Sequence, residues 1–452
     1  MERERFGSKF TFVMALAGSA IGLGNIWRFP YVVGEYGGAA FVVVYVICSL
    51  LISLPILYCE TIIGRNARCS IVPAMDKIAP GTGWKRIGIL ALLASFIIGS
   101  FYSVVGGWSV FYFFKSLFEG ISPASTTEAT AMFGEFSGSV FRPIFSHGLF
   151  LATTTVIVLL GITRGIERFT KITTPLLFVM IVLLAVFSLT LPGSRAGVDY
   201  LVQPDFSKLN ARGIAYAMGQ SFFSMSLGIG CVLIYSTYMK KETSVSASGL
   251  WTCFFDTLFA IIAGFAVMPA VFSAGIAPGS GPTLVFETLP YIFSSMSAES
   301  PILSRLVSTL FFFAILMAAL TSSISVVSVC VEHLCDRLGY GRKKAANLVF
   351  LAMFLLGALC SLSFGVLSDV NIFGHNIFGA CDTLASNYLM MAGAFAFSIF
   401  VGWVMDPATV RAEFTGEESQ RLGRVLYKPF RFLVRWVVPI AIFIVFVSNF
   451  LL

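Results

Sequence analysis

The chain has 452 residues, of which 57% are hydrophobic and 12% are charged, and its formal net charge is +7 at pH 7. The high hydrophobic fraction, the low charged fraction and a mean hydropathy of +0.88 exclude a soluble globular domain of ordinary composition. Crossing the roughly 30 Å hydrocarbon core of a bilayer takes about 20 apolar residues, and the chain contains many runs of that length. The composition therefore predicts an integral α-helical membrane protein.

The apolar runs predict eleven membrane-spanning helices. Their ranges are 9–36, 39–63, 87–118, 145–163, 169–191, 213–238, 245–274, 303–334, 345–366, 378–405 and 433–451. The longest polar stretches between them are 119–143, 192–212 and 406–428. None of these is long enough for a soluble domain.

The 30 Lys and Arg residues are distributed unevenly over these spans. If the N-terminus is inside, most of them fall in cytoplasmic segments, including 65–86, 337–344 and 411–435. This asymmetry follows the positive-inside rule. The basic excess therefore predicts the orientation in the membrane rather than a nucleic-acid partner, and eleven spans place the C-terminus outside.

Several catalytic chemistries lack their motifs. The nine Cys show no CxxC spacing and are interpreted as small core residues. The three His have no metal-ligand spacing, and no P-loop GxxxxGK[ST] occurs. No nucleophile–base constellation is present either, so we expect no enzyme.

The first span is interrupted in its middle by GSAIGLGNIWRFP, residues 18–30. Lipid cannot satisfy freed backbone N–H and C=O groups, so such a break must face protein, water or a ligand. A small-residue packing motif, Gly18-x-x-x-Gly22, explains the glycines. It does not explain Asn25, Arg28 and Pro30, which follow closely.

A second interruption lies five spans later. AIGLGN at 20–25 is echoed by SLGIGC at 226–231, again in the middle of a span. Interrupted segments at matching positions of two halves indicate an inverted-repeat transporter with its site at the membrane midplane.

The segments GSAIGLGNIWRFPY, GQSFFSMSLGIG (219–230) and LTSSIS (320–325) resemble the neurotransmitter:sodium symporters, in particular their bacterial amino-acid members. The resemblance covers essentially the whole chain in the same order. It implies an all-α membrane fold of two inverted five-helix repeats, 1–191 and 192–405, with helices 1 and 6 broken. A cytoplasmic loop and helix 11 follow in 406–452, where most members of the family have twelve helices.

The implied function is Na⁺-coupled symport of an L-amino acid across the cell (inner) membrane by alternating access. A membrane-embedded amino-acid sensor without net transport is the alternative. The expected partners are the amino acid, sodium ions and membrane lipid, and the expected oligomeric state is a monomer or a weak dimer.

The resemblance also implies two sodium sites. The first takes the carbonyl of Ala20, the side chains of Asn25, Ser224 and Asp256, and the substrate carboxylate. The second takes the carbonyls of Gly18, Ile21 and Ala318 with the hydroxyls of Thr321 and Ser322. From the residues alone, these two hydroxyls are equally explained by hydrogen bonds back to their own helix.

In the implied substrate site, the N–H groups of Leu23 and Gly24 and the hydroxyl of Tyr102 meet the carboxylate. The implied side-chain pocket consists of Ile98, Val105, Phe223, Ser226, Ile229, Ala319, Ser322 and Val326. Ile229 replaces an aromatic of the family's small-aliphatic pockets, and Val326 replaces a longer Ile. Both changes enlarge the cavity, which predicts a large hydrophobic or aromatic substrate.

Two charge pairs resemble the family's gates. Arg28 and Asp382 are expected to close the outer side, with Phe223 and Tyr102 as a lid. Arg3 and Asp336, with Phe6 and Tyr238, are expected to close the cytoplasmic side, where the family usually has Trp in place of Phe6.

Two further features complete the resemblance. Glu60 occupies the position that braces the unwound part of helix 6. Gly165 and Pro175 match a pattern associated with cytoplasmic unwinding of helix 5, although both are also ordinary helix caps.

Asp256 stands where chloride-dependent animal members carry Asn, beside Tyr45, Gln220 and Ser224. We expect its carboxylate to replace chloride and to bind a proton once sodium leaves. The alternative from the residues alone is a helix-capping or helix-packing Asp.

Overall fold

The computed structural model describes residues 5–276, 284–295, 300–416 and 421–451. Within these ranges the regular structure is helical, apart from one isolated antiparallel bridge between Ile372 and His375. The α-helices, in chain order, are α1 (Lys9–Ala20), α2 (Phe29–Glu35), α3 (Ala39–Cys48), α4 (Leu54–Ala67), α5 (Ile71–Ile78), α6 (Lys85–Phe118), α7 (Thr126–Gly138), α8 (Phe141–Leu159), α9 (Arg168–Thr190), α10 (Arg195–Val202), α11 (Ala211–Ser224), α12 (Cys231–Ser236), α13 (Val245–Ser273), α14 (Leu284–Ser295), α15 (Pro301–Leu338), α16 (Arg342–Leu362), α17 (Ile377–Asp382), α18 (Met390–Ile399), α19 (Pro407–Thr415), α20 (Arg421–Phe432) and α21 (Val438–Leu451).

Wider π-helical turns join several of these helices into longer spans. They are Gly24–Arg28, Ser49–Ser53, Ile162–Glu167, Thr383–Leu389, Phe400–Val404 and Leu433–Val437. Among the described residues, nine helical segments are long and apolar enough to cross a membrane, and α1 with Gly24–Glu35 makes a tenth that bends by 47°. The predicted sixth span is also helical, but residues 225–230 divide it into α11 and α12.

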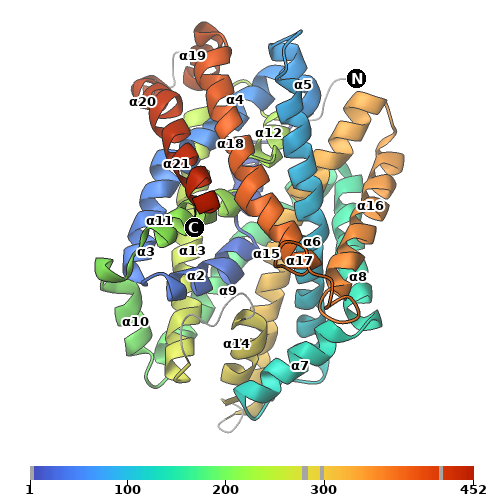
Figure 1. The fold of residues 1–452 in the computed structure, drawn as a ribbon, viewed down its shortest axis with the longest axis vertical. Coiled ribbons are helices and arrows are strands. Elements are labelled where there is room, and N and C mark those ends of the chain that lie inside the picture. Colours follow the sequence, from blue (N-terminus) through green and yellow to red (C-terminus); the bar gives the residue numbers. More distant parts are fainter. Residues whose placement is uncertain (1–4, 277–283, 296–299, 417–420, 452) are drawn as a thin grey trace.

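The helices differ in how deeply they lie in the molecule. In the most apolar stretch of α15, 83% of the residues are buried, against 33% in that of Arg421–Val447. α15 packs along α6, and α1 contacts α9, α13 and α15. Figure 1 shows the N-terminus, α5, α19 and α20 at one end of the molecule, and α7, α10 and α14 at the other. The polar stretches between spans therefore contain helices that the sequence did not predict.

The first break follows from the local sequence. Ser8 caps α1 in a capping box with Thr11. α1 ends at Ala20, and the next residue, Ile21, has an extended backbone with ψ 97°. The chain resumes as the π-helical turn Gly24–Arg28, and Pro30 then stands in the first turn of α2, where its missing N–H costs nothing. The polar groups of the break thus lie in the protein interior, since Asn25 is fully buried.

The second break is held by a buried carboxylate. Glu60 accepts hydrogen bonds from the backbone N–H of Gly228 (2.7 Å) and of Leu233 (3.2 Å). These bonds substitute for intrahelical bonds that the break removes, at the position the resemblance assigned to Glu60. Gly228 has φ +82° and packs so closely against the carbonyl of Met390 that a Cβ would collide with it.

The helix-5 pattern takes a specific form. Gly165 lies in the π-helical turn Ile162–Glu167, packed against the carbonyl of Ile157, and Pro175 lies inside α9. Pro175 is therefore not a cap at the helix start, and an N-terminal cap does not explain the pair.

Candidate functional site

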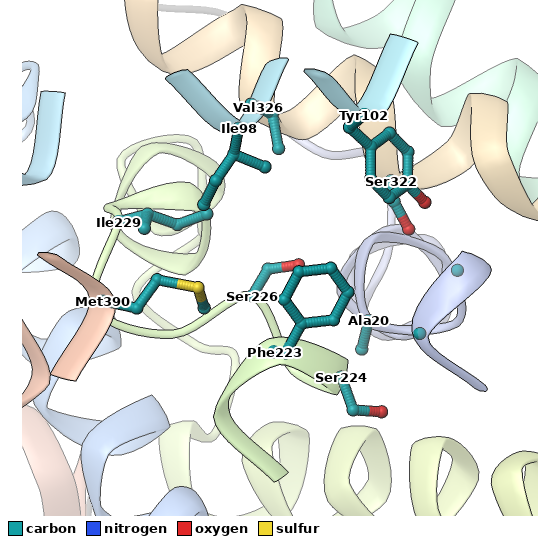
Figure 2. Close-up of a pocket in the computed structure, with 12 residues that line it drawn as sticks. Ala20, Ile98, Tyr102, Phe223, Ser224, Ser226, Ile229, Ser322, Val326 and Met390 are labelled. Carbon is teal, nitrogen blue, oxygen red and sulfur yellow. The ribbon is translucent and has the colours of Figure 1, made fainter. Parts of the chain in front are cut away.

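A small pocket lies between the two helix breaks. Its lining consists of Ala20, Gly22, Gly24, Ile98, Tyr102, Phe223, Ser224, Ser226, Ile229, Ser322, Val326 and Met390. Figure 2 shows Tyr102, Ser322 and Ala20 on one side of this space and Ile229 and Met390 on the other. The pocket therefore has a polar side at the first break and an apolar side beyond the second.

Hydrogen bonds order the polar side. The N–H of Leu23 donates to the Tyr102 hydroxyl at 3.1 Å. The hydroxyls of Ser226 and Ser322 donate to the Ser19 carbonyl at 3.3 and 3.0 Å. Backbone groups of the broken helix thus lie within one small volume with the Tyr102 phenol and two serine hydroxyls. This combination suits a zwitterionic ligand, which carries an ammonium and a carboxylate group.

Most of the predicted substrate residues line this pocket. Leu23, Val105 and Ala319 do not: all three are fully buried but lie outside the lining. Met390 lines the pocket and was not predicted, because a single Met in an apolar helix carries no pattern. Ser19 was also missed, although it lies inside the glycine-rich motif.

The residues predicted for the first sodium site form a tight cluster. Asn25 Nδ2 donates to Ser224 Oγ at 3.0 Å and to Asp256 Oδ1 at 2.9 Å, and Ser224 Oγ donates to Asp256 Oδ1 at 2.7 Å. Tyr45 OH lies 3.3 Å from Asp256 Oδ2. Ser224 Oγ, Tyr45 OH and the Asp256 carboxylate are oxygen groups suited to a hard monovalent cation, whereas Asn25 directs its Nδ2 to the cluster and its Oδ1 to the Gly22 N–H. Ala20 lines the adjoining pocket.

Part of the predicted second sodium site is also assembled. Thr321 Oγ1 is 3.2 Å from the carbonyl oxygen of Ile21, across the break, and 2.9 Å from that of Ala318. The same hydroxyl also lies 3.3 Å from the Met317 carbonyl of its own helix, so the back-bonded alternative is present as well. Ser322 points instead to the Ser19 carbonyl and the pocket.

The carbonyl of Gly18 belongs to the same predicted site. Gly18 packs against α9, where a Cβ would collide with Thr174 Oγ1. Only a residue without a side chain fits this approach.

The predicted outer-gate residues lie around one cavity next to the pocket. Arg28 and Asp382 both line this cavity together with Phe223 and His375, but no ion pair within 4 Å joins them in the described structure. Arg28 instead stacks over the Phe223 ring, with its Cζ 4.6 Å from the centroid. Phe223 thereby separates the charged cavity from the pocket.

On the opposite side, the N-terminal segment is tied down. Phe6 is buried, and its N–H donates to the Tyr238 carbonyl at 3.2 Å. The N–H of Gly7 bonds the carboxylate of Glu167 at 3.1 Å. Asp336 accepts from the N–H of Ser70 at 2.6 Å, and its predicted partner Arg3 lies outside the described residues.

Comparisons with known proteins show which family the chain belongs to. The model of the sodium:neurotransmitter symporter family matches residues 3–131 and 136–452. The chain is 37% identical to YhdH, an uncharacterized sodium-dependent transporter of Bacillus subtilis, over 98% of this chain and 97% of that protein. It is 27% identical to the sodium- and chloride-dependent taurine transporter of Homo sapiens, over 89% of this chain and 72% of that protein.

A solved structure matches over the same extent. The crystal structure of MhsT in complex with L-phenylalanine aligns with a TM-score of 0.91 at 39% identity, over 99% of this chain and 100% of that one. The predicted all-α membrane fold with two inverted five-helix repeats is therefore confirmed, as are a transport rather than an enzymatic role and Na⁺ as the coupling ion. The chain belongs to the sodium:neurotransmitter symporter family.

Proposed function

We propose that this protein couples the entry of Na⁺ to the uptake of a large hydrophobic or aromatic L-amino acid by alternating access. The observation that carries the proposal is the two-sided pocket, which has polar groups at the helix breaks and Ile98, Ile229, Val326 and Met390 opposite them. An α-amino acid with an apolar side chain matches this division. The L-phenylalanine bound to MhsT supports the same substrate class.

Coupling follows from groups shared between ion and substrate. Ser224 lies both in the Asn25–Asp256 cluster and in the pocket lining. If the substrate carboxylate completes the first sodium site, each solute binds more tightly when the other is present, and the effect is reciprocal.

The two sides of the pocket suggest how access alternates. Phe223 and the stacked Arg28 separate the pocket from the outer cavity. On the other side, Phe6 and Gly7 fasten the N-terminal segment to Tyr238 and Glu167. Transport then requires that one set of contacts opens while the other stays closed.

The proposal also covers the orientation of the protein in the membrane, its repeats and its oligomeric state. The N-terminus lies at the same end as the basic helix α20, which by the positive-inside rule is the cytoplasmic end. The repeats are proposed to span 1–191 and 192–405, and the protein to act as a monomer or a weak dimer. A sensor without net transport would bind the same ligands but would fail in counterflow uptake by proteoliposomes.

The second sodium site predicts an effect of Thr321→Ala. Hydrogen bonds to charged groups typically contribute about 1.5–3 kcal/mol, so loss of this oxygen should weaken the apparent Na⁺ affinity about ten- to hundredfold. Uptake by proteoliposomes over a range of Na⁺ concentrations measures the change. Thr321→Ser keeps the hydroxyl and should stay near wild type, whereas a wild-type Na⁺ affinity in Thr321→Ala rules out the site.

The outer gate predicts that Arg28→Ala nearly abolishes transport. In the proposed closed gate Arg28 pairs with Asp382, directly or through water, and removing one partner of a buried charge pair typically costs about 3–5 kcal/mol. Arg28→Lys loses the planar group that stacks on Phe223. Arg212→Lys is the matched control, because Arg212 lines a second cavity together with Arg28 but does not stack on Phe223. Normal uptake in both Arg28→Lys and Asp382→Asn would contradict the gate.

The apolar side of the pocket predicts selectivity by size. In a competition assay with Na⁺, Phe, Leu, Ile, Tyr or Trp should displace a labelled substrate at lower concentration than Gly or Ala. Ile229→Phe should fill the pocket and shift the preference toward small amino acids, whereas Ile47→Phe, at a position that is 49% exposed on the outside of the molecule, should not. Tighter binding of Gly or Ala to the wild type would overturn the assignment.

Asp256 predicts transport that does not depend on chloride. A carboxylate beside Na⁺ provides a fixed negative charge, whose effect is large at low dielectric constant. Uptake in gluconate buffer should equal uptake in chloride buffer, and Asp256→Asn should lose uptake in gluconate and regain part of it in chloride. Asp205→Asn, at an exposed position, is the matched control. A wild type that stops without chloride, or an Asp256→Asn variant indifferent to chloride and pH, contradicts this role.

A further inference from the structure

Two cysteines meet beside the outer gate. Cys360 lies near the end of α16 and Cys381 lies in α17, immediately before Asp382. The Cys360 thiol donates to Cys381 Sγ at a sulfur–sulfur distance of 3.7 Å. Cys360 is fully buried, whereas Cys381 is partly exposed.

The surrounding contacts hold the two helix ends together independently of the thiols. Phe378 N donates to Ser363 Oγ at 3.3 Å, and Ser363 Oγ donates to the Cys360 carbonyl at 2.7 Å. The ring of Phe378 packs against Trp108 and Phe364 at centroid distances of 5.8 and 5.2 Å. The packing of α17 against the end of α16 therefore brings the two sulfurs close to each other.

A disulfide requires a sulfur–sulfur distance of about 2.05 Å between side chains whose Cβ atoms are roughly 3.5–4.5 Å apart. Thiols already in contact reach that distance by small side-chain rotations, provided that the helices stay in place. The packing of α17 against α16 supplies this condition.

The bond would act on the segment that carries the gate. Asp382 faces the outer cavity with Arg28, and its carboxylate accepts from Ser386 Oγ at 2.7 Å in the following turn. That turn leads into α18, whose first residue, Met390, lines the substrate pocket. A covalent link at Cys381 would fix this whole path to α16.

We propose that Cys360 and Cys381 form an oxidisable dithiol site that locks the outer gate segment, with a low-molecular-weight disulfide as oxidant. The Cys381 thiolate attacks one sulfur of that disulfide, forming a mixed disulfide and releasing one thiolate. The Cys360 thiolate then attacks Cys381 Sγ and releases the second. The protons lost by the two cysteines protonate the released thiolates, so the protein dithiol is oxidised while the small disulfide is reduced to two thiols.

The test uses the purified full-length protein, incubated with oxidised glutathione and mapped by peptide mass spectrometry without reduction. The expected result is a peptide pair linked through Cys360 and Cys381. After reconstitution, Na⁺-driven uptake should fall in proportion to the linked fraction and recover on addition of dithiothreitol. The transport readout rests on the proposed function, whereas the peptide mapping does not.

Single variants separate the site from general thiol damage. Uptake by Cys360→Ser and by Cys381→Ser should survive oxidised glutathione once mixed disulfides are excluded by mass, whereas Cys48→Ser should lose uptake like the wild type. Absence of the linked peptide in folded, monodisperse protein overturns the site, and undiminished uptake by fully linked protein overturns the lock. If the reduced protein shows no Na⁺-driven uptake while the linked peptide forms, the proposed function fails and the dithiol site stands.

Discussion

The fold depends on one constraint, which is that two helices are broken inside apolar spans, where lipid cannot satisfy the freed backbone groups. Each break is therefore surrounded by substitutes. Glu60 takes the N–H groups of Gly228 and Leu233 at the second break, and Asn25 Oδ1 takes that of Gly22 at the first. Such a carboxylate is buried only where it is hydrogen-bonded. The hydrogen bonds of Glu60 to the second break therefore fix the position of α4 relative to α12.

The same constraint creates the binding chemistry. Carbonyls freed by the first break and hydroxyls from α15 converge, as in the contact of Thr321 with the Ile21 carbonyl. The Asp256 carboxylate accepts hydrogen bonds from Asn25, Ser224 and Tyr45. A cation bound there would replace the hydrogens of these donors, and Asn25 would have to turn its Oδ1, which accepts from the Gly22 N–H, toward the ion.

Most of the residues that the sequence predicted for the candidate site lie together in the structure, because the sequence signals are chemical. Glycine and polar residues inside an apolar run have few explanations in a membrane, so both breaks were predictable. Val105 and Ala319 were assigned to the pocket but lie outside its lining, because the direction that a residue of a long helix faces depends on helix rotation and tilt. Met390 was missed for the same reason, and α7 and α10 were missed because polar surface helices lack the hydropathy signal of a span.

In the proposed outer gate, the environment of Arg28 favours movement. Arg28 Nη1 is buried and has no hydrogen-bond partner among the described residues, although its guanidinium stacks on Phe223. An unsatisfied buried donor of this kind is costly, so the arrangement favours any movement that brings an acceptor to it. Asp382 lines the same cavity and is such an acceptor. Since Phe223 belongs to both the stack and the pocket, a ligand that repositions the ring would also change the cost of leaving Arg28 unpaired, and the proposed gate would respond in this way to occupancy of the pocket.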